Sequence, residues 1–185
     1  MAKFYLEEPN LKRKLQAVEY IEEHFQCKSN INGSGGLDKG YIQYEEWLKS
    51  DELKRKQETC PKNLCPGYTY FLIREEDDEL IGMIDIRYNL NDAMLQSGGH
   101  IGYGIRPSER NKGYNKINLY LGLQKCKEVG LDNVLLIASD SNPASYRTII
   151  SLGGILENKL FDYEDNSMMG RYWIDVNKSL NIYKE

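Results

Sequence analysis

Residues 110–115 read Arg110-Asn111-Lys112-Gly113-Tyr114-Asn115. This turn joins an apolar segment predicted to be a strand, His100–Ile105, to a segment with helical patterning that begins near Gly113. The first turn of a helix leaves backbone N–H groups without partners and carries the positive end of the helix dipole, so it can hold an anion such as a pyrophosphate. Gly113 lets backbone and phosphate approach closely, and Arg110 and Lys112 add positive charge. The turn is therefore a predicted anion-binding site.

A second pattern follows further along the chain. It runs from Asp140-Ser141-Asn142-Pro143-Ala144-Ser145 to Ser151-Leu152-Gly153-Gly154. Asn142 suits the N-cap of a helix and Pro143 its first position, while the two glycines suit its end. An Arg-x-x-Gly-x-(Gly/Ala) loop after an apolar strand, followed at this spacing by an Asn-initiated helix that ends at glycine, resembles the GNAT superfamily of N-acetyltransferases. The resemblance covers residues 68–176.

The resemblance implies a fold and an activity. The fold would be α+β, with a GNAT-like mixed central sheet whose splayed parallel strands are flanked by helices. Residues 1–185 would form one acetyltransferase-like domain, with a helical acceptor-side segment at 1–67 and an acetyl-CoA-binding core at 68–176. The chain would transfer an acetyl group from acetyl-CoA to a primary amine of a small molecule or peptide by direct attack of the amine. Two alternatives stay open at this point: a non-catalytic acyl-CoA-binding module, and a structural interaction domain without a ligand.

The predicted cofactor contacts also follow from the resemblance. In the family, pantetheine enters the gap between the strand before the loop and the strand before the Asn-initiated helix, where it pairs with free backbone groups, and the pyrophosphate lies on the loop. The residues at the matching positions here are Tyr103, Ile105, Arg106, Arg110, Asn111, Lys112, Gly113, Tyr114, Asn115, Asn142 and Ser145. Asn142 as a helix cap only and Arg110 as a solvated turn charge are the simpler alternatives. Asn115 departs from the Gly or Ala that usually ends the family's loop.

Direct attack requires a neutral amine. An alkylamine with a pKa of about 10.4 is mostly protonated at neutral pH, and removing its proton costs about 4 to 5 kcal/mol. A base or a chain of waters is therefore useful. The family often places a glutamate near the start of the strand before the loop, and this sequence has His100 there, whose ordinary pKa of about 6.5 suits a base. A hydrogen-bonded histidine at a strand end is the alternative.

The leaving thiolate has to be protonated or stabilised. Many family members use a tyrosine seven residues after the Asn, and this sequence has Ile149 there. Tyr146, Ser145 or water would have to replace it, and Tyr146 is predicted as the second catalytic residue. On the adjacent predicted strand, Asp85 and Arg87 point to the same side and are predicted to bind the substrate, with an exposed cross-strand pair as the alternative.

The composition bounds the size of the core and the class of partner. With 185 residues, 41% hydrophobic and 28% charged, the chain can bury one substantial core. A formal charge of −4 and a pI near 5.4 argue against a nucleic-acid partner, which requires a concentrated basic surface. The acidic start, Met1–Glu8, has no signal-peptide character, and no apolar run of about 18 residues occurs. We therefore expect a cytoplasmic protein with no membrane partner, and a homodimer stays open.

The cysteines and histidines do not predict a metal site. The four cysteines are Cys27, Cys60, Cys65 and Cys126. Zinc sites use a gap such as that between Cys60 and Cys65, but His24 and His100 are isolated in different predicted elements. We expect no metal, and we expect Cys126 to be a small residue of the core.

Two helices are predicted in the first third of the chain, at residues 11–25 and 41–58. The connection Gly33-Ser34-Gly35-Gly36 between them is interpreted as flexible and, secondarily, as a substrate-side loop. The remaining predicted elements are strands at 68–74, 80–88 and 100–105, a helix at 113–129, a strand at 134–139, a helix from Asn142, and strands at 155–163 and 171–176, with a strand at 3–6 left open. The acidic run 75–79 predicts a solvated hairpin tip, and residues 164–167 predict a turn.

Overall fold

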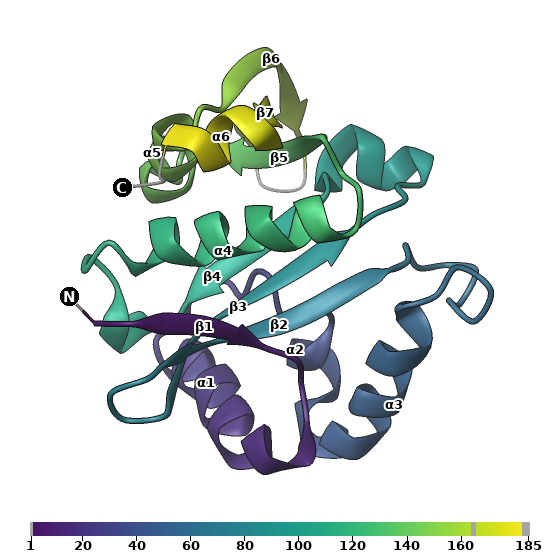
Figure 1. The fold of residues 1–185 in the computed structure, drawn as a ribbon, viewed down its shortest axis with the longest axis vertical. Coiled ribbons are helices and arrows are strands. Elements are labelled where there is room, and N and C mark those ends of the chain that lie inside the picture. The colour runs from purple at the N-terminus through teal and green to yellow at the C-terminus, as the bar shows by residue number, and fades with distance from the viewer. Residues whose placement is uncertain (1, 164–165, 183–185) are drawn as a thin grey trace.

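The computed structural model describes residues 2–163 and 166–182, which fold into two antiparallel sheets and the helices that cover them (Figure 1). In chain order the elements are β1 (Phe4–Glu7), α1 (Lys14–Gln26), α2 (Leu37–Gly40), α3 (Tyr44–Lys54), β2 (Gly67–Arg74), β3 (Glu79–Arg87), β4 (Ile101–Ile105), α4 (Tyr114–Glu128), β5 (Asn133–Ser139), α5 (Pro143–Ser151), β6 (Ile155–Asp162), β7 (Ser167–Asp175) and α6 (Val176–Ile182). The strand that the sequence left open at 3–6 is present as β1. The predicted turn at 164–167 lies partly outside the described residues.

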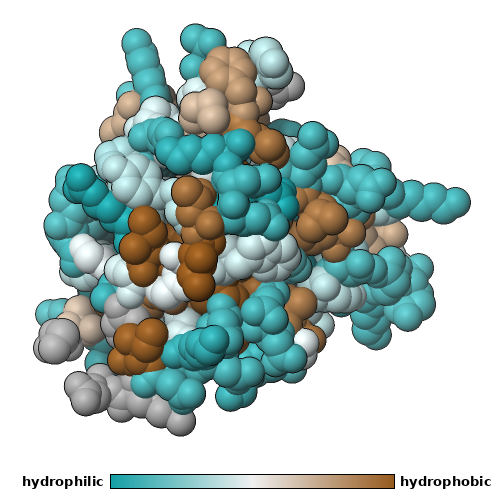
Figure 2. Space-filling view, turned by 90° about the horizontal axis from the view of Figure 1, so that it is seen from above, coloured by the Kyte–Doolittle hydropathy of each residue, from teal (hydrophilic) through white to brown (hydrophobic). Residues whose placement is uncertain are grey.

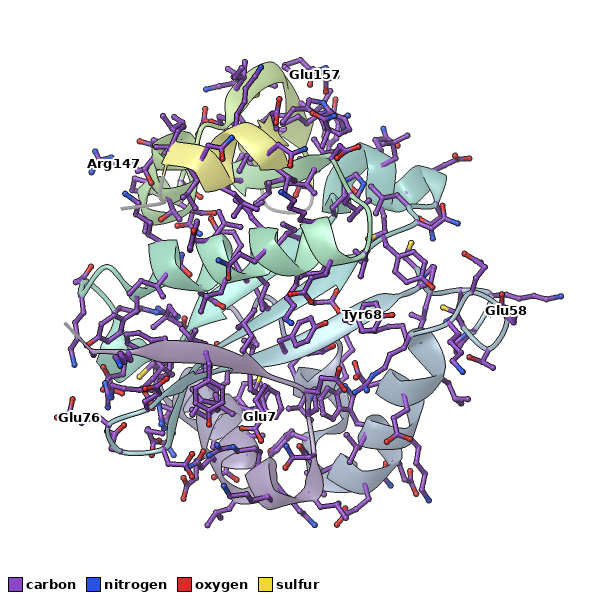
Figure 3. All side chains as sticks on the ribbon, viewed as in Figure 1. Glu7, Glu58, Tyr68, Glu76, Arg147 and Glu157 are labelled. Atoms are coloured by element: carbon purple, nitrogen blue, oxygen red, sulfur yellow. The ribbon has the colours of Figure 1, made fainter. Side chains whose placement is uncertain are left out.

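The first sheet has the strand order β1-β2-β3-β4, and every neighbouring pair is antiparallel. β2 and β3 are nearly continuous runs of β-branched, aliphatic and aromatic residues, and they are buried on both faces. The acidic turn between them is exposed, as predicted, and Glu76 points away from the protein (Figure 3). This sheet therefore lies in the middle of the molecule with one solvated hairpin end.

Helices cover both faces of the first sheet. α4 lies on one face, and α1, α2 and α3 lie on the other (Figure 1). Leu119, Leu123 and Cys126 of α4 are fully buried in one apolar cluster, so the predicted core position of Cys126 is confirmed. Ala17 and Tyr20 of α1 belong to a second cluster on the opposite side. The sheet thus separates a face covered by α4 from a face covered by the N-terminal helices.

The second sheet has the strand order β5-β7-β6 and is also antiparallel. Its contact with the first sheet is at His100, whose backbone N–H donates to the carbonyl oxygen of Leu135 over 2.7 Å. The expected α+β class is confirmed, and the pairings within both sheets are antiparallel, so the splayed parallel strands of the expected mixed sheet stay a prediction. Hydrophobic patterning along the sequence predicts which strands are buried, but it does not predict which strands pair with each other.

The structure differs from the predicted elements in three places. The helix predicted at 41–58 ends at Lys54, where the Thr59 hydroxyl donates to the Leu53 carbonyl oxygen over 2.7 Å. The polar link before β4 contains one π-helical turn, Met94–Gly98. α6 was not predicted, although Asp175 accepts a hydrogen bond from the Lys178 N–H over 3.0 Å, an N-cap pattern that the sequence contains.

Apolar side chains are also exposed at the end of the molecule that carries the second sheet. Seen from that end, brown apolar groups lie among hydrophilic ones (Figure 2). The exposed large apolar residues of β6, β7 and the segment between them are Ile155, Leu156, Phe161, Tyr163 and Met168. Among residues 2–163 and 166–182, no helix is both long and apolar enough to cross a membrane.

Candidate active site

The turn before α4 has the backbone shape of an anion cradle. Asn111 has a φ of 63° and Gly113 a φ of 80°, so two of its residues are left-handed. Gly113 is the N-cap of α4 and, as a glycine, brings no side chain to cap the helix. A Cβ atom on Gly113 would meet nothing within 4 Å, so there is open space beside this residue. The main chain therefore offers uncapped donors at the positive end of a 15-residue helix, and this arrangement fits a pyrophosphate.

The cationic side chains of the turn contribute less than the sequence suggested. Arg110 turns back, and its guanidinium donates to the Ile105 carbonyl oxygen over 3.2 Å and to the Ser29 hydroxyl over 2.7 Å. Lys112 forms an ion pair with Glu109 over 2.8 Å. Arg110 thus fixes the shape of the turn, and both cationic side chains are engaged with other groups of the protein.

Arg106 holds the segment before the turn in place. Its backbone N–H donates to the Ile81 carbonyl oxygen over 2.9 Å, so the backbone donor predicted to bind pantetheine is already paired with β3. Its guanidinium forms ion pairs with Glu23, over 2.8 Å, and with Glu79. Glu23 also accepts from the Ser108 N–H over 2.6 Å, and although burial opposes this, the bonds from Ser108 and Arg106 lower the pKa of Glu23. Arg106 is a structural residue here.

Tyr103 and Ile105 have the backbone orientation expected of cofactor contacts. The Arg87 N–H donates to the His100 carbonyl oxygen and the Arg106 N–H to that of Ile81. Along an antiparallel strand, every second residue bonds to a given neighbouring strand. His100 and Arg106 bond to β3, so residues 101, 103 and 105 turn their backbone N–H and C=O groups away from β3. The N–H and C=O groups of Tyr103 and Ile105 therefore point away from β3, and the Ile105 carbonyl oxygen already accepts the bond from Arg110.

The side chain of Tyr103 reaches from β4 to the first turn of α5. Its hydroxyl lies 3.3 Å from the Ser145 carbonyl oxygen and 3.3 Å from the Ser145 hydroxyl. Asn142 caps α5 by accepting from the Ser145 N–H over 3.2 Å, which confirms its predicted capping role. Ile149, one turn further along, is fully buried. Tyr146 is half-buried, and since successive helical residues point about 100° apart, its side chain does not share the face of Ser145 and Ile149.

His100 links the two sheets through its side chain as well as its backbone. Its Nδ1 accepts a hydrogen bond from the Leu135 N–H over 2.9 Å. The proton of the neutral ring is therefore on Nε2, so the ring has no free lone pair with which to act as a base. Burial, and then the nearby charge of Arg87, lower the pKa of His100. The geometry thus favours the alternative reading, a hydrogen-bonded histidine at the strand end, over the predicted base.

Asp85 belongs to a buried network of charges and is not an exposed cross-strand partner. It is 3% exposed, and Lys54 of α3 donates to it over 2.7 Å. Lys54 also lies 3.3 Å from Asp51, and the Thr69 hydroxyl donates to Asp51 over 2.6 Å. Burial opposes the charged form of Asp85, but Lys54 and then Arg87 keep its pKa low. The buried carboxylates of Asp51 and Asp85 are thus both in ion pairs with Lys54.

Arg87 is the member of this network that reaches the surface. Its side chain is 22% exposed, and it forms an ion pair with Asp85 over 3.0 Å and donates to the Gly99 carbonyl oxygen over 3.0 Å. Arg87 and His100 are opposite each other at the end of the β3–β4 ladder. The two predicted substrate residues are therefore in contact, Asp85 in the interior and Arg87 partly at the surface.

The glycine-rich connection lies on the first sheet and does not behave as a free tether. A Cβ atom on Gly33, which has a φ of 77°, would lie 2.7 Å from the carbonyl oxygens of Met83 and Gly102. The absence of a side chain lets the main chain lie directly on β3 and β4. Ser34 is buried and donates to Asp38 over 2.5 Å. The connection thus covers the same face of the sheet that carries Asp85.

A shallow cavity of about 430 Å³ lies on the second sheet, on the face that carries Trp173. The Trp173 ring is 6.0 Å from the His100 ring, and Arg171 is on the same face of β7. The cavity is lined by Asp92, Leu95, Gln96, Glu157, Asn158, Leu160 and Arg171. Glu157, on β6, lies at the end of the molecule that carries the second sheet (Figure 3).

Metal ligands do not gather within the described ranges 2–163 and 166–182. No group of three or more His, Cys, Asp or Glu side chains is placed there to hold a metal ion. Cys60 and Cys65 are free thiols, and Cys65 accepts a hydrogen bond from the Asn91 N–H. The absence of a metal requirement stays a prediction.

Comparison with models of protein families matches residues 38–155 to the acetyltransferase (GNAT) domain. The chain belongs to the GNAT acetyltransferase family. As a member it is an acetyl-CoA-dependent acyltransferase, and the family resemblance inferred from the turn and the Asn-capped helix is confirmed. A search of curated proteins returns no match.

Solved structures share the fold of this GNAT chain over nearly its whole length. The ribosomal-protein-S5-alanine acetyltransferase from Vibrio fischeri has a TM-score of 0.69 at 13% identity, covering 95% of this chain and 97% of its own. The spermidine/spermine N-acetyltransferase from Vibrio cholerae has a TM-score of 0.65 at 14% identity, covering 98% and 100%. The microcin C7 self-immunity acetyltransferase, solved with acetyl-CoA and AMP, has a TM-score of 0.66 at 15% identity, covering 92% and 91%. At these identities the likeness establishes the fold alone.

The structure adds residues to this GNAT site that the sequence did not single out. Lys54 and Asp51 are the clearest, because both occupy the buried stripe of α3 that begins at Trp47. Charged residues at positions with helical core spacing were the available signal. Glu23 gave no such signal, since its partners Arg106 and Ser108 are far away in sequence.

Proposed function

We propose that this protein transfers the acetyl group of acetyl-CoA to a primary amine of a small molecule or peptide. The observation that carries the proposal is the uncapped, left-handed turn from Asn111 to Gly113 at the start of α4. Backbone donors at a helix N-terminus bind phosphate without help from a particular side chain. Acetyl-CoA would contact the turn through its pyrophosphate, with Tyr114 and Asn115 in the first turn of α4.

The acetyl end of the cofactor would lie where β4 and β5 separate. The two strands are hydrogen-bonded at His100 and Leu135, and we propose that they run parallel and splay apart from there towards the turn. The backbone groups of Tyr103 and Ile105 face that side and suit the pantetheine amides. Asn142 and Ser145 border the same region from α5. Acetyl-CoA supplies the activated acetyl group, and the chain supplies binding and orientation.

The acceptor would approach from the face covered by the glycine-rich connection. Gly33 lies on Gly102, Asp85 lies beneath, and Arg87 reaches the surface beside His100. The solved relatives by fold include enzymes named for spermidine and for a ribosomal-protein alanine, and both acceptors are amines. The shallow cavity beyond Trp173 would hold the remainder of the acceptor.

The proton of the amine would leave through water. His100 accepts a backbone hydrogen bond at Nδ1, so it cannot also take the amine proton at its protonated Nε2. A positive charge nearby lowers the pKa of an amine, and Arg87 lies at the surface where the acceptor would enter. The enzyme would then select the neutral fraction of the amine, and turnover would rise with pH until the amine is deprotonated.

Calorimetry with acetyl-CoA and an assay of free-thiol release over a panel of amines test the proposal. Gly113→Asp should abolish binding, because a carboxylate would fill the phosphate space and repel the phosphates. Gly130→Asp is the matched control, since Gly130 follows the other end of the same helix with a φ of 81°, and a Cβ atom there would also meet nothing within 4 Å. Wild-type affinity in Gly113→Asp would contradict the placement of the cofactor.

The second candidate function is a non-catalytic acyl-CoA-binding module. The specific observation in its favour is that Ile149, buried in α5, occupies the position where many GNAT enzymes have a tyrosine. Acetyl-CoA binding that depends on Gly113, without thiol release for any amine in the panel, would favour this function over catalysis.

A further inference from the structure

The proton donor for the leaving thiolate has no side chain at its usual position in this chain. Ile149 is apolar and 0% exposed, so that point of α5 offers no hydroxyl. Tyr146 is three residues away from Ile149 along the helix, and its ring packs against the apolar cluster from a partly exposed position. The donor must therefore come from another element or from water.

A tyrosine hydroxyl does reach this part of α5, but from the opposite wall. Tyr103 extends from β4 and places its hydroxyl 3.3 Å from both oxygens of Ser145. Ser145 and Ile149 are four residues apart, so they are neighbours on one face of α5. The Tyr103 hydroxyl thus lies one helical turn before Ile149, the position at which many family members have their tyrosine. Its own backbone faces the side of β4 on which the cofactor is proposed to lie.

We propose that Tyr103 is the catalytic acid that protonates the thiolate of coenzyme A, with Ser145 orienting its hydroxyl. The inference rests on the proposed function. In the reaction, the amine nitrogen attacks the acetyl carbon, the C–N bond forms, the C–S bond breaks and its electron pair goes to sulfur. The Tyr103 O–H proton then passes to sulfur. The proton lost from the amine nitrogen returns to the Tyr103 oxygen through the Ser145 hydroxyl and water, so the net products are the amide and the free thiol.

The surroundings of Tyr103 suit this role. The residue is 9% exposed, and burial raises the pKa of its phenol above the ordinary value, so the hydroxyl stays protonated at neutral pH. The Ser145 hydroxyl and carbonyl oxygen hold the phenol at a fixed position. A donor that remains neutral until the thiolate forms stabilises the negative charge when it develops.

Tyr103→Phe removes the hydroxyl and keeps the ring, and Tyr70→Phe is its matched control. Tyr70 and Tyr103 are both paired with Ile84, one from each side, so the three side chains form one row across the sheet. Both tyrosines are buried in the same apolar cluster. We expect kcat to fall about 10²-fold in Tyr103→Phe, with little change in KM for acetyl-CoA, and to stay near wild type in Tyr70→Phe.

A second measurement does not depend on turnover. The ultraviolet absorbance of the thiolate gives the titration midpoint of coenzyme A bound to the protein. A hydrogen bond from Tyr103 to the thiolate should place this midpoint about one pH unit lower in wild type than in Tyr103→Phe. A fall in kcat without this difference, or this difference without a fall in kcat, would overturn the assignment of Tyr103. Absence of thiol release from wild type with every amine would instead overturn the proposed function, and the midpoint would still report on Tyr103.

Discussion

Replacing His100 by Asn and by Ala separates a structural histidine from a catalytic base. The His100 ring accepts the Leu135 N–H over 2.9 Å, and Leu135 is fully buried. His100→Ala leaves that buried donor without an acceptor, which costs about 1 to 3 kcal/mol of unfolding free energy. His100→Asn places an amide oxygen where Nδ1 was, so it should recover most of this loss. The Asn side chain has no titratable group.

Urea unfolding and the thiol-release assay together measure the outcome. We expect His100→Asn to unfold close to wild type and to keep kcat within about 10-fold, because a general base contributes typically 10²-fold or more. His100→Ala should lose stability and, with the junction of β4 and β5 loosened, bind acetyl-CoA more weakly. If His100→Asn is as stable as wild type but its kcat falls by about 10² or more, the base predicted from the sequence is correct and the argument from the Leu135 hydrogen bond is wrong.

Two further predictions concern buried charge. Lys54→Met should lower the unfolding free energy by about 3 to 5 kcal/mol, because it leaves two buried carboxylates without their shared ammonium. Lys14→Met, at an exposed ion pair, should change the unfolding free energy little. Equal effects of the two substitutions in urea unfolding would refute the role of the buried network. Acidification should also weaken the fold. Burial lowers the pKa of His24, although its bond to the Tyr20 carbonyl oxygen opposes the shift. Burial and then the charge of Arg87 lower the pKa of His100. Because the unfolded chain binds these protons at about pH 6.5 and the folded chain only at lower pH, stability is complete above about 6.5 and falls as the pH drops through the folded pKa values. Urea midpoints followed from about pH 8 to pH 5 should show a smaller fall in His100→Asn than in wild type.

The parts of the site that sequence reasoning predicted correctly are those whose signals are local. Gly113 marks the left-handed start of α4, and Asn142 with Pro143 marks the start of α5, because both signals lie within a few residues of the backbone groups they satisfy. The role of His100 was not accessible in this way. Its tautomer is set by the N–H of Leu135, a residue on another sheet, and strand patterning does not reveal such a contact.

Burial of polar residues was the second limit. The alternation of β3 predicted that Asp85 and Arg87 share a face, which the register confirms, but it did not predict that α3 would cover Asp85 with Lys54. The glycines at 33–36 were interpreted as flexible because glycine is permissive in isolation. In the folded chain the same property allows Gly33 to lie against β3 and β4, and composition does not distinguish the two uses.

The N-terminal helices and the cofactor turn are mechanically linked. Glu23, near the end of α1, holds Arg106 and the Ser108 N–H, and Ser29 accepts from Arg110 just beyond the helix. These bonds tie the acceptor side of the protein to the turn that would bind the pyrophosphate. Because rigid attachment at several points fixes the direction of backbone N–H groups, the cost of ordering the turn is met when the protein folds and not when the cofactor binds. The N-terminal segment would therefore support the proposed cofactor site through its bonds to Arg106, Ser108 and Arg110.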